Sequence, residues 1–265
     1  MTMNELIRFE LRKLFQMKTL YIFAGVIVAF LAMNVATYKF TDILIQSDAL
    51  QTAGMDLSML FSGPYDGKKF LVSGLLNTEA AISLAVVVSL INCSDFSSGA
   101  IKNIFAKGYT RLEVLFAKIT VSMVVALLFT LLCYLFGFFF GSILWQDIGS
   151  GWTAGIPVIL LVQILLMFAY TSMFCFMASF IKKTAGTLVL SIGIPMSFEI
   201  IFMIINLLVN DKGFNINNYW IQGNITNLSD AAATDSDIIR GFVVATLYFG
   251  IFTVANILIS RKREV

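Results

Sequence analysis

The stretch "DFSSGAIKNIFAKGYTR", Asp95 to Arg111, is a short polar segment between two long apolar runs. It carries three cationic side chains and two glycines, whereas the whole chain is 58 % apolar and only 13 % charged, with a mean hydropathy of +0.87. Soluble domains are usually about 45–50 % apolar and about 25 % charged. The composition therefore indicates a polytopic membrane protein, in which the quoted segment is a loop on one side of the membrane.

The apolar runs predict the number of membrane spans. A helix that crosses the hydrocarbon core needs roughly 20 mostly apolar residues. Six stretches of the 265-residue sequence qualify: 20–36, 71–93, 119–145, 156–181, 187–209 and 240–260. We therefore predict an all-α integral membrane fold, with six transmembrane helices in a single domain that covers residues 1–265.

The N-terminal segment, residues 1–18, has the pattern of an amphipathic helix. Its apolar residues recur at helical spacing, at Met3, Leu6, Ile7, Leu11, Leu14 and Phe15, and its opposite face carries Arg8, Arg12 and Lys13. This pattern favours a helix that lies in the membrane interface ahead of the first span. A plain extension of the first span is the alternative.

The cationic residues predict the orientation of the spans. In a six-span arrangement most of the 18 Lys and Arg residues fall on one side, in the N-terminus, in the loop 94–118, at Lys182 and Lys183, and in the C-terminus. The remaining cations are Lys39, Lys68, Lys69, Lys212 and Arg240. By the positive-inside rule, both termini and the quoted segment are cytoplasmic.

The loop 94–118 has a recognisable order of residues. Asp95 stands at the end of the second span, Gly99 precedes the helix-compatible run "AIKNIFAKG", "YTR" follows, and Lys118 stands at the head of the third span. A short helix parallel to the membrane would expose a small apolar and basic surface, which suits docking into a groove of a soluble partner. The alternative is an ordinary loop whose charges only hold the topology.

This arrangement resembles the permease subunits of bacterial ABC exporters of the type-2 class. In that family an acidic residue ends span two, a "coupling helix" docks on the ATPase subunit, and a Pro/Gly-x-Ser-Arg motif and a Lys follow. The matching positions are Asp95, Gly99, Lys102, Gly108, Thr110, Arg111 and Lys118, and the resemblance implies that these residues, with Lys107, couple the chain to the ATPase. Asp95 stands for the more usual Glu, Ala100 for Thr and Thr110 for Ser. Within the family the chain looks most like small permeases of peptide-toxin exporters and lantibiotic-immunity permeases.

The resemblance implies a function and a set of partners. The chain would be half of a translocation pathway in the bacterial plasma membrane, paired with a second permease copy or paralogue, and would export amphipathic or antimicrobial peptides. ATP and Mg²⁺ would bind a separate cytoplasmic ATPase, so the chain itself would not be an enzyme. Its nearest match to a P-loop, "GPYDGKK" at 63–69, is one residue short and lacks the Ser or Thr that binds magnesium.

Two carboxylates, Glu79 and Glu199, lie inside predicted spans. A charge at mid-helix is costly, and such residues usually face a cavity or a partner. They are candidates for the substrate pathway, where they would bind cationic groups. A structural carboxyl at a helix interface is the alternative for both. The Phe- and Met-rich run 173–180 supplies an adaptable apolar surface that serves either substrate binding or helix packing.

Other classes of function leave different signals in a sequence. An intramembrane enzyme is disfavoured, because the chain has no His, no HExxH, no G-x-S-x-G and no paired intramembrane aspartates. An ion-driven secondary carrier often shows inverted repeats, and none is evident between the two halves of the chain. A secondary carrier and a non-transporting scaffold remain the alternatives to the exporter.

Overall fold

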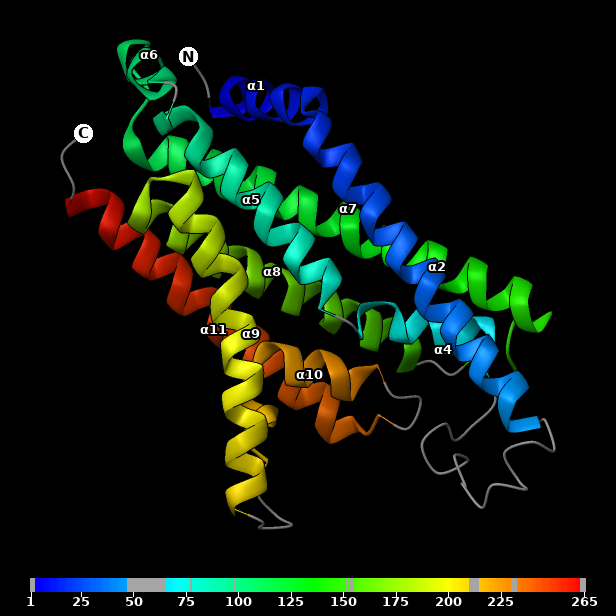
Figure 1. The fold of residues 1–265 in the computed structure, drawn as a ribbon. Helices are drawn as coiled ribbons and strands as arrows, with labels where there is room; N and C mark the ends of the chain where they lie inside the picture. The colour runs from blue at the N-terminus through cyan, green and yellow to red at the C-terminus, as the bar shows by residue number, and fades with distance from the viewer. Residues whose placement is uncertain are drawn as a thin grey trace.

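The computed structural model describes residues 3–46, 65–76, 78–97, 99–150, 152, 155–209, 215–229 and 233–262. Every regular element in these ranges is a helix (Figure 1). Six helices are long and apolar enough to cross a membrane: α2 (Lys18–Gln46), α5 (Glu79–Ser97), α7 (Arg111–Trp145), α8 (Gly155–Ile181), α9 (Thr184–Val209) and α11 (Asp235–Lys262). The predicted all-α fold with six long apolar helices is confirmed.

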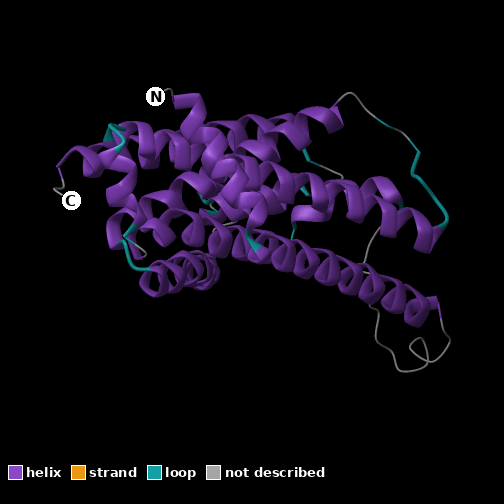
Figure 2. Ribbon diagram, turned by 90° about the horizontal axis from the view of Figure 1, so that it is seen from above, coloured by secondary structure: helices purple, strands orange, loops and turns teal. Residues whose placement is uncertain are grey.

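The six helices alternate in direction, so their connections fall at two ends of the bundle. At one end, here called the basic end, lie α1 (Met3–Gln16), α6 (Ala100–Ala106) and the last turns of α11 (Figures 1 and 2). The opposite end, called the far end, carries α4 (Gly67–Val72) and α10 (Ile221–Leu228). Both chain termini therefore lie at the basic end, as the six-span arrangement requires.

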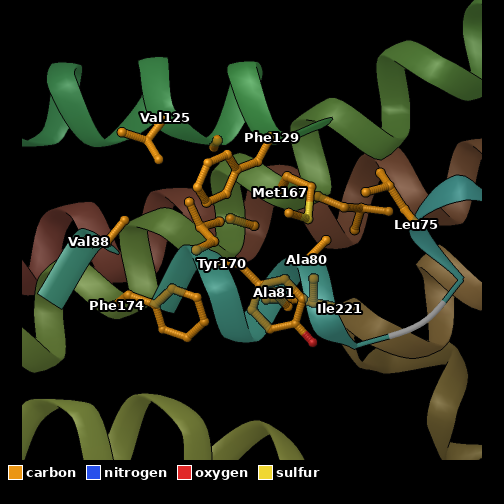
Figure 3. Packing of buried hydrophobic residues seen from close by; sticks show 14 of the residues in the cluster. Leu75, Ala80, Ala81, Val88, Val125, Phe129, Met167, Tyr170, Phe174 and Ile221 are labelled. Carbon is orange, nitrogen blue, oxygen red and sulfur yellow. The ribbon is translucent and has the colours of Figure 1, made fainter. Parts of the chain in front are cut away.

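The centre of the bundle is formed by α5 and α8. In an apolar 18-residue stretch of each helix, 67 % of the residues are buried in α5 and 61 % in α8, against 17 % in α2 and α11 and 11 % in α9. Figure 3 shows Phe129 of α7 and Met167, Tyr170 and Phe174 of α8 packed together, with Ala81 of α5 beside them. The small side chain of Ala81 leaves room for the large rings.

The outer helices present apolar residues on their exposed faces. On α9, for example, Met203 is 72 % exposed and Leu207 is 79 % exposed. An apolar surface of this extent marks contact with lipid or with another protein rather than with water. The distribution of burial is therefore that of a multi-pass membrane protein, in which lipid covers the periphery.

A few buried polar side chains join the central helices. The amide of Asn92 in α5 donates to the Ser122 hydroxyl of α7 at 3.3 Å and to the Cys175 sulfur of α8 at 3.6 Å. The Cys93 sulfur lies 3.3 Å from the Thr187 hydroxyl and so joins α5 to α9. All three cysteines are buried and free. Such bonds fix how helices meet when apolar contact alone does not distinguish one face from another.

The predicted start of the second span at Leu71 is wrong. The span is α5, which begins at Glu79, while the preceding residues form α4 and the 3₁₀ helix η2 (Ser73–Leu75). This segment lies against α7 because glycines allow a close approach. A Cβ on Gly137 of α7 would lie 2.5 Å from the Phe70 carbonyl oxygen, and one on Gly74 would lie 2.9 Å from the Cys133 carbonyl oxygen.

Part of the rejected P-loop match is the start of α4. Asp66 caps this helix by accepting from the Lys69 amide at 2.7 Å. The Gly67 and Lys68 amides donate to the carbonyl oxygens of Asp147 and Ile148. These amides are thus engaged within the fold, whereas a P-loop needs its backbone amides for phosphate. Gly63 and Pro64 of the match lie outside the described residues.

At the far end, two glutamines hold α4, η2 and α10 to the bundle. The fully buried Gln163 of α8 donates to the Val72 carbonyl at 3.0 Å and accepts from the Tyr134 hydroxyl at 3.0 Å. Gln222 of α10 donates to the Leu76 carbonyl at 3.1 Å. These amides satisfy carbonyls at the ends of short helices, which would otherwise be left without partners.

The segments 38–70 and 211–239, which separate predicted spans at the far end, contain helical structure. Helix α2 continues to Gln46 and α4 begins at Gly67, while η3 (Ile216–Tyr219) and α10 occupy much of the second segment. Residues 47–64 and 210–214, which include Lys212, lie outside the described residues. The apolar side of α10, with Ile221, Ile225 and Leu228 buried, explains why this segment is folded.

We expect Gly137→Ala to destabilise the protein by about 1–3 kcal/mol, because the added methyl group overlaps the backbone of α4. Gly250→Ala is the matched control, since a Cβ at Gly250 of α11 has no atom within 4 Å. Thermal unfolding of the detergent-solubilised protein measures both effects. Equal melting temperatures for the two variants would contradict the close packing of α4 on α7.

Candidate functional site

The short helix α6 lies at the basic end, between α5 and α7 (Figure 1). Two glycines with left-handed backbone bracket it, Gly99 with φ of 71° and Gly108 with φ of 89°. A Cβ at either position would meet no atom within 4 Å, so the conformation itself accounts for glycine there. The two glycines let the chain turn sharply into α6 and out of it.

One face of α6 is buried and the other is exposed. Ile101 and Ile104 are buried in a small apolar cluster, separate from the main core, with Leu6 of α1 and Val114 and Ala117 of α7. The exposed face carries Lys102, Asn103, Ala106 and Lys107. A helix is confirmed within the predicted run "AIKNIFAKG", over Ala100–Ala106, and it turns a basic surface outward.

A capping box starts α7 directly after α6. The Thr110 hydroxyl accepts from the Glu113 amide at 3.3 Å, and the Thr110 amide donates to the Glu113 carboxylate at 2.7 Å. This reciprocal pair fixes where the helix begins. Arg111 is the first residue of α7 and is exposed. The third long helix therefore starts at Arg111, eight residues before the predicted 119, and the connection is shorter than 94–118.

Asp95 and Lys118 are buried rather than displayed. The Asp95 carboxylate is 2.5 Å from the Lys118 ammonium and is also paired with Lys13 of α1. Lys118 donates further to the Ile91 carbonyl at 2.9 Å, and Lys13 donates to the Ser94 hydroxyl at 3.1 Å. Lys118 is the eighth residue of α7, so it lies within this helix rather than in the connection before it. These residues join α1, α5 and α7, and the exposed surface belongs to other residues.

Sequence reasoning missed two members of this cluster, Lys13 and Glu10. Lys13 was assigned to the exposed basic face of α1, yet its side chain reaches Asp95 and is only 29 % exposed. Glu10 is 2 % exposed, and neither of its carboxylate oxygens has a hydrogen-bond partner within the described part of the chain. Its spacing was a usable signal, because Glu10 lies four residues from both Leu6 and Leu14 and so shares their buried face.

Burial raises the pKa of the Glu10 carboxyl above its ordinary value of 4.5. The nearby Lys118 ammonium lowers this pKa, the Asp95 carboxylate raises it, and the Lys13 ammonium lowers it, but burial has the largest effect. Glu10 is thus the member of the cluster whose charge the fold disfavours.

A groove of about 670 Å³ separates α1 from α6 at the basic end. Its polar lining includes Glu5 of α1, Asn103 of α6, Lys107 directly after α6, and the paired Lys13 and Asp95. Phe9 and Tyr109 supply aromatic surface. The groove and the exposed face of α6 together form a mixed basic and apolar surface, of the kind that receives a segment of a partner protein.

The two predicted pathway carboxylates lie away from this surface. Glu79 is the first residue of α5, at the far end, and lines a small cavity with Asn34 and Cys133. Glu199 of α9 follows the row Thr187, Ser191 and Pro195, which is buried toward α5. Its carboxylate accepts a hydrogen bond from the Thr78 side chain, while its Oε1 atom is buried without a partner among the described residues. The structure thus brings Glu199 next to the start of α5.

An apolar cleft of about 430 Å³ opens between α8, α9 and α11, and Phe198, the residue before Glu199, is part of its lining. Aromatic rings follow one another along it at centroid distances of 5.0–6.3 Å, in the order Phe180, Phe176, Phe252, Tyr248, Trp220 and Phe198. The Phe- and Met-rich run 173–180 supplies Met173, Phe176, Met177 and Phe180 to the lining. These side chains were predicted to serve packing or substrate binding, and their position in a cleft is compatible with both.

No protein-family model matches this chain, and no curated protein matches it significantly. The candidate function therefore has to rest on the geometry of the site.

We expect Asp95→Ala to destabilise the protein by about 3–5 kcal/mol, because it leaves the buried Lys118 ammonium without a counter-charge. The double variant Asp95→Leu/Lys118→Met removes both buried charges and should recover most of that loss. Thermal unfolding in one detergent compares the two variants with the native chain. A double variant no more stable than Asp95→Ala would contradict the role of the pair.

We expect Glu10→Gln to stabilise the protein at neutral pH and to do so less at low pH. Since the pKa of Glu10 is raised in the fold, stability falls as pH rises from the ordinary value of 4.5 to the raised one, and the loss is constant above both. The glutamine variant lacks this dependence. Melting temperatures of both proteins across that pH range test this, and a difference independent of pH would contradict it.

Proposed function

We propose that this chain is the membrane-spanning permease subunit of an ATP-driven exporter of the type-2 ABC class. It forms half of a translocation pathway in the bacterial plasma membrane, beside a second permease copy or paralogue. A separate cytoplasmic ATPase binds ATP and Mg²⁺, and this chain contributes no bond chemistry. Both termini and the basic end face the cytoplasm, in accordance with the positive-inside rule.

The observation that carries the proposal is the position of α6 and its attachment to α1 and α7. This helix stands at the basic end with Lys102 and Lys107 exposed, while Ile101 and Ile104 attach it to α1 and α7. The groove beside it offers room for a segment of the ATPase. A short helix with this attachment can pass a displacement of a docked partner into two long helices.

The roles of the predicted coupling residues follow from their positions. Lys102, Lys107 and Arg111 are exposed and are proposed to contact the ATPase. Gly99, Gly108 and Thr110 set the turns and the helix start around α6. Asp95 and Lys118 transmit movement by tying α5 to α7 and α1.

For the substrate, we propose an amphipathic cationic peptide. The aromatic cleft between α8, α9 and α11 supports this by offering apolar surface with adaptable Met side chains. Glu199, whose Oε1 atom has no partner among the described residues, supplies an anionic group beside it. Glu79 is the second candidate, at the start of α5.

We expect Lys102→Glu and Arg111→Glu each to weaken ATPase binding about tenfold or more, since reversed charges meet an anionic partner surface. The measurement is a pull-down from detergent after co-expression with an ABC ATPase encoded beside this chain's gene. Lys68→Glu, at the far end, is the matched charge reversal and should leave binding unchanged. If neither the native chain nor any variant retains an ATPase, the exporter proposal fails and a carrier or scaffold takes its place.

A further inference from the structure

A second, smaller cavity of about 70 Å³ lies on the other side of α6, between this helix and the ends of α5, α7, α8 and α11. Its lining carries three cations and three neutral polar side chains, Arg111, Lys118, Lys182, Asn92, Ser179 and Ser260. No carboxylate belongs to the lining as the described residues define it. The cavity is several times larger than the roughly 10–15 Å³ that a single water molecule requires.

Lys182 is placed at this cavity by an unusual helix end. It follows the last residue of α8 with φ of 58°, and its amide donates to the Ala178 carbonyl at 2.9 Å. Glycine or asparagine is the common choice for such a left-handed cap, because a β-carbon is disfavoured there. The ammonium lies 5.3 Å from the centre of the Phe96 ring, which also lines the cavity. The cation is therefore directed over the cavity.

Lys118 is a buried member of the cavity lining, and Asn256 of α11 is a buried residue outside that lining. Lys118, 3 % exposed, shares Asp95 with Lys13, so one carboxylate serves two ammonium groups. On α11, Asn256 lies one turn before Ser260 and on the same face. Asn256 is fully buried, and neither atom of its amide has a partner within the described part of the chain. The cations and hydroxyls of the lining are all hydrogen-bond donors, so the site is suited to an anion with several oxygens.

We propose that this cavity binds the phosphate group of an anionic membrane lipid. The cavity lies where four long apolar helices, α5, α7, α8 and α11, begin or end, which is the depth of the lipid headgroups. Basic pockets between membrane helices at this depth bind anionic headgroups. Ile101, Phe105 and Ile259 add apolar lining for the adjoining part of the lipid. The proposal needs no ATPase and is independent of the proposed export function.

The test uses the full-length chain in detergent without any ATPase. Phosphatidylglycerol, phosphatidylcholine or inorganic phosphate is titrated in, and binding is followed by the rise in melting temperature and by native mass spectrometry. We expect phosphatidylglycerol to bind more tightly than phosphatidylcholine. Lys182→Gln should weaken phosphatidylglycerol binding about fivefold, the loss expected for one cation near an anionic headgroup. Lys182→Arg should keep native affinity.

Lys183→Gln is the matched control, because Lys183 is the exposed neighbour in the same turn and does not line the cavity. It should bind phosphatidylglycerol as the native chain does. An equal loss in Lys183→Gln would show diffuse attraction and overturn the site. If inorganic phosphate binds and Lys182→Gln weakens that binding equally, the site recognises free phosphate, and the proposal of a lipid ligand is overturned. Circular dichroism of each variant separates lost binding from lost folding.

Discussion

The Asp95 carboxylate is the constraint on which the basic end depends. It binds the Lys118 ammonium of α7 and the Lys13 ammonium of α1, and it stands near the end of α5. A buried ammonium without a counter-charge would be costly, so the three helices cannot separate without exposing or stranding a charge. The apolar contacts that hold α6 at this end lie next to this cluster of charged residues. Leu6, Ile101, Ile104 and Val114 pack beside it, and α6 takes its place on them.

In the rest of the bundle, small and polar residues, rather than the amount of apolar surface, determine which helix faces pack together. Helices surrounded by lipid gain little from apolar contact with one another, so close packing and buried hydrogen bonds decide which faces meet. Gly137 lets α4 approach α7, and Asn92 joins α5 to α7 and α8. Gln163 holds the far end in the same way that Asp95 holds the basic end. The two ends differ in that a buried ion pair joins separate helices at the basic end, whereas the Lys39–Asp42 and Arg240–Asp237 pairs at the far end each lie within one helix.

Much of this arrangement could be predicted from the sequence, for reasons that particular residues make plain. Long apolar runs identify membrane helices almost by length alone, and "AIKNIFA" has the spacing of a short helix. The break before Glu79 could not be foreseen, because Gly74 acts through a contact with α7 that is 59 residues distant in sequence. The pairing of Lys13, which is predicted only as part of the basic face of α1, could not be foreseen for a similar reason. Its partner Asp95 lies 82 residues further along the chain, and spacing within one helix gives no sign of it.

Two groups of charged residues, one buried and one exposed, have different proposed roles around α6. A helix that is to transmit force must be held firmly on one side and remain open on the other. Asp95 and Lys118 provide the firm attachment, because a buried ion pair resists separation. The exposed Lys102 and Lys107 provide the open side. In the sequence, the buried pair and the exposed lysines belong to the same short charged stretch and cannot be told apart. Burial separates them, because Lys102 and Lys107 are exposed whereas Asp95 and Lys118 are buried, and the proposed contact with an ATPase therefore falls to the exposed lysines.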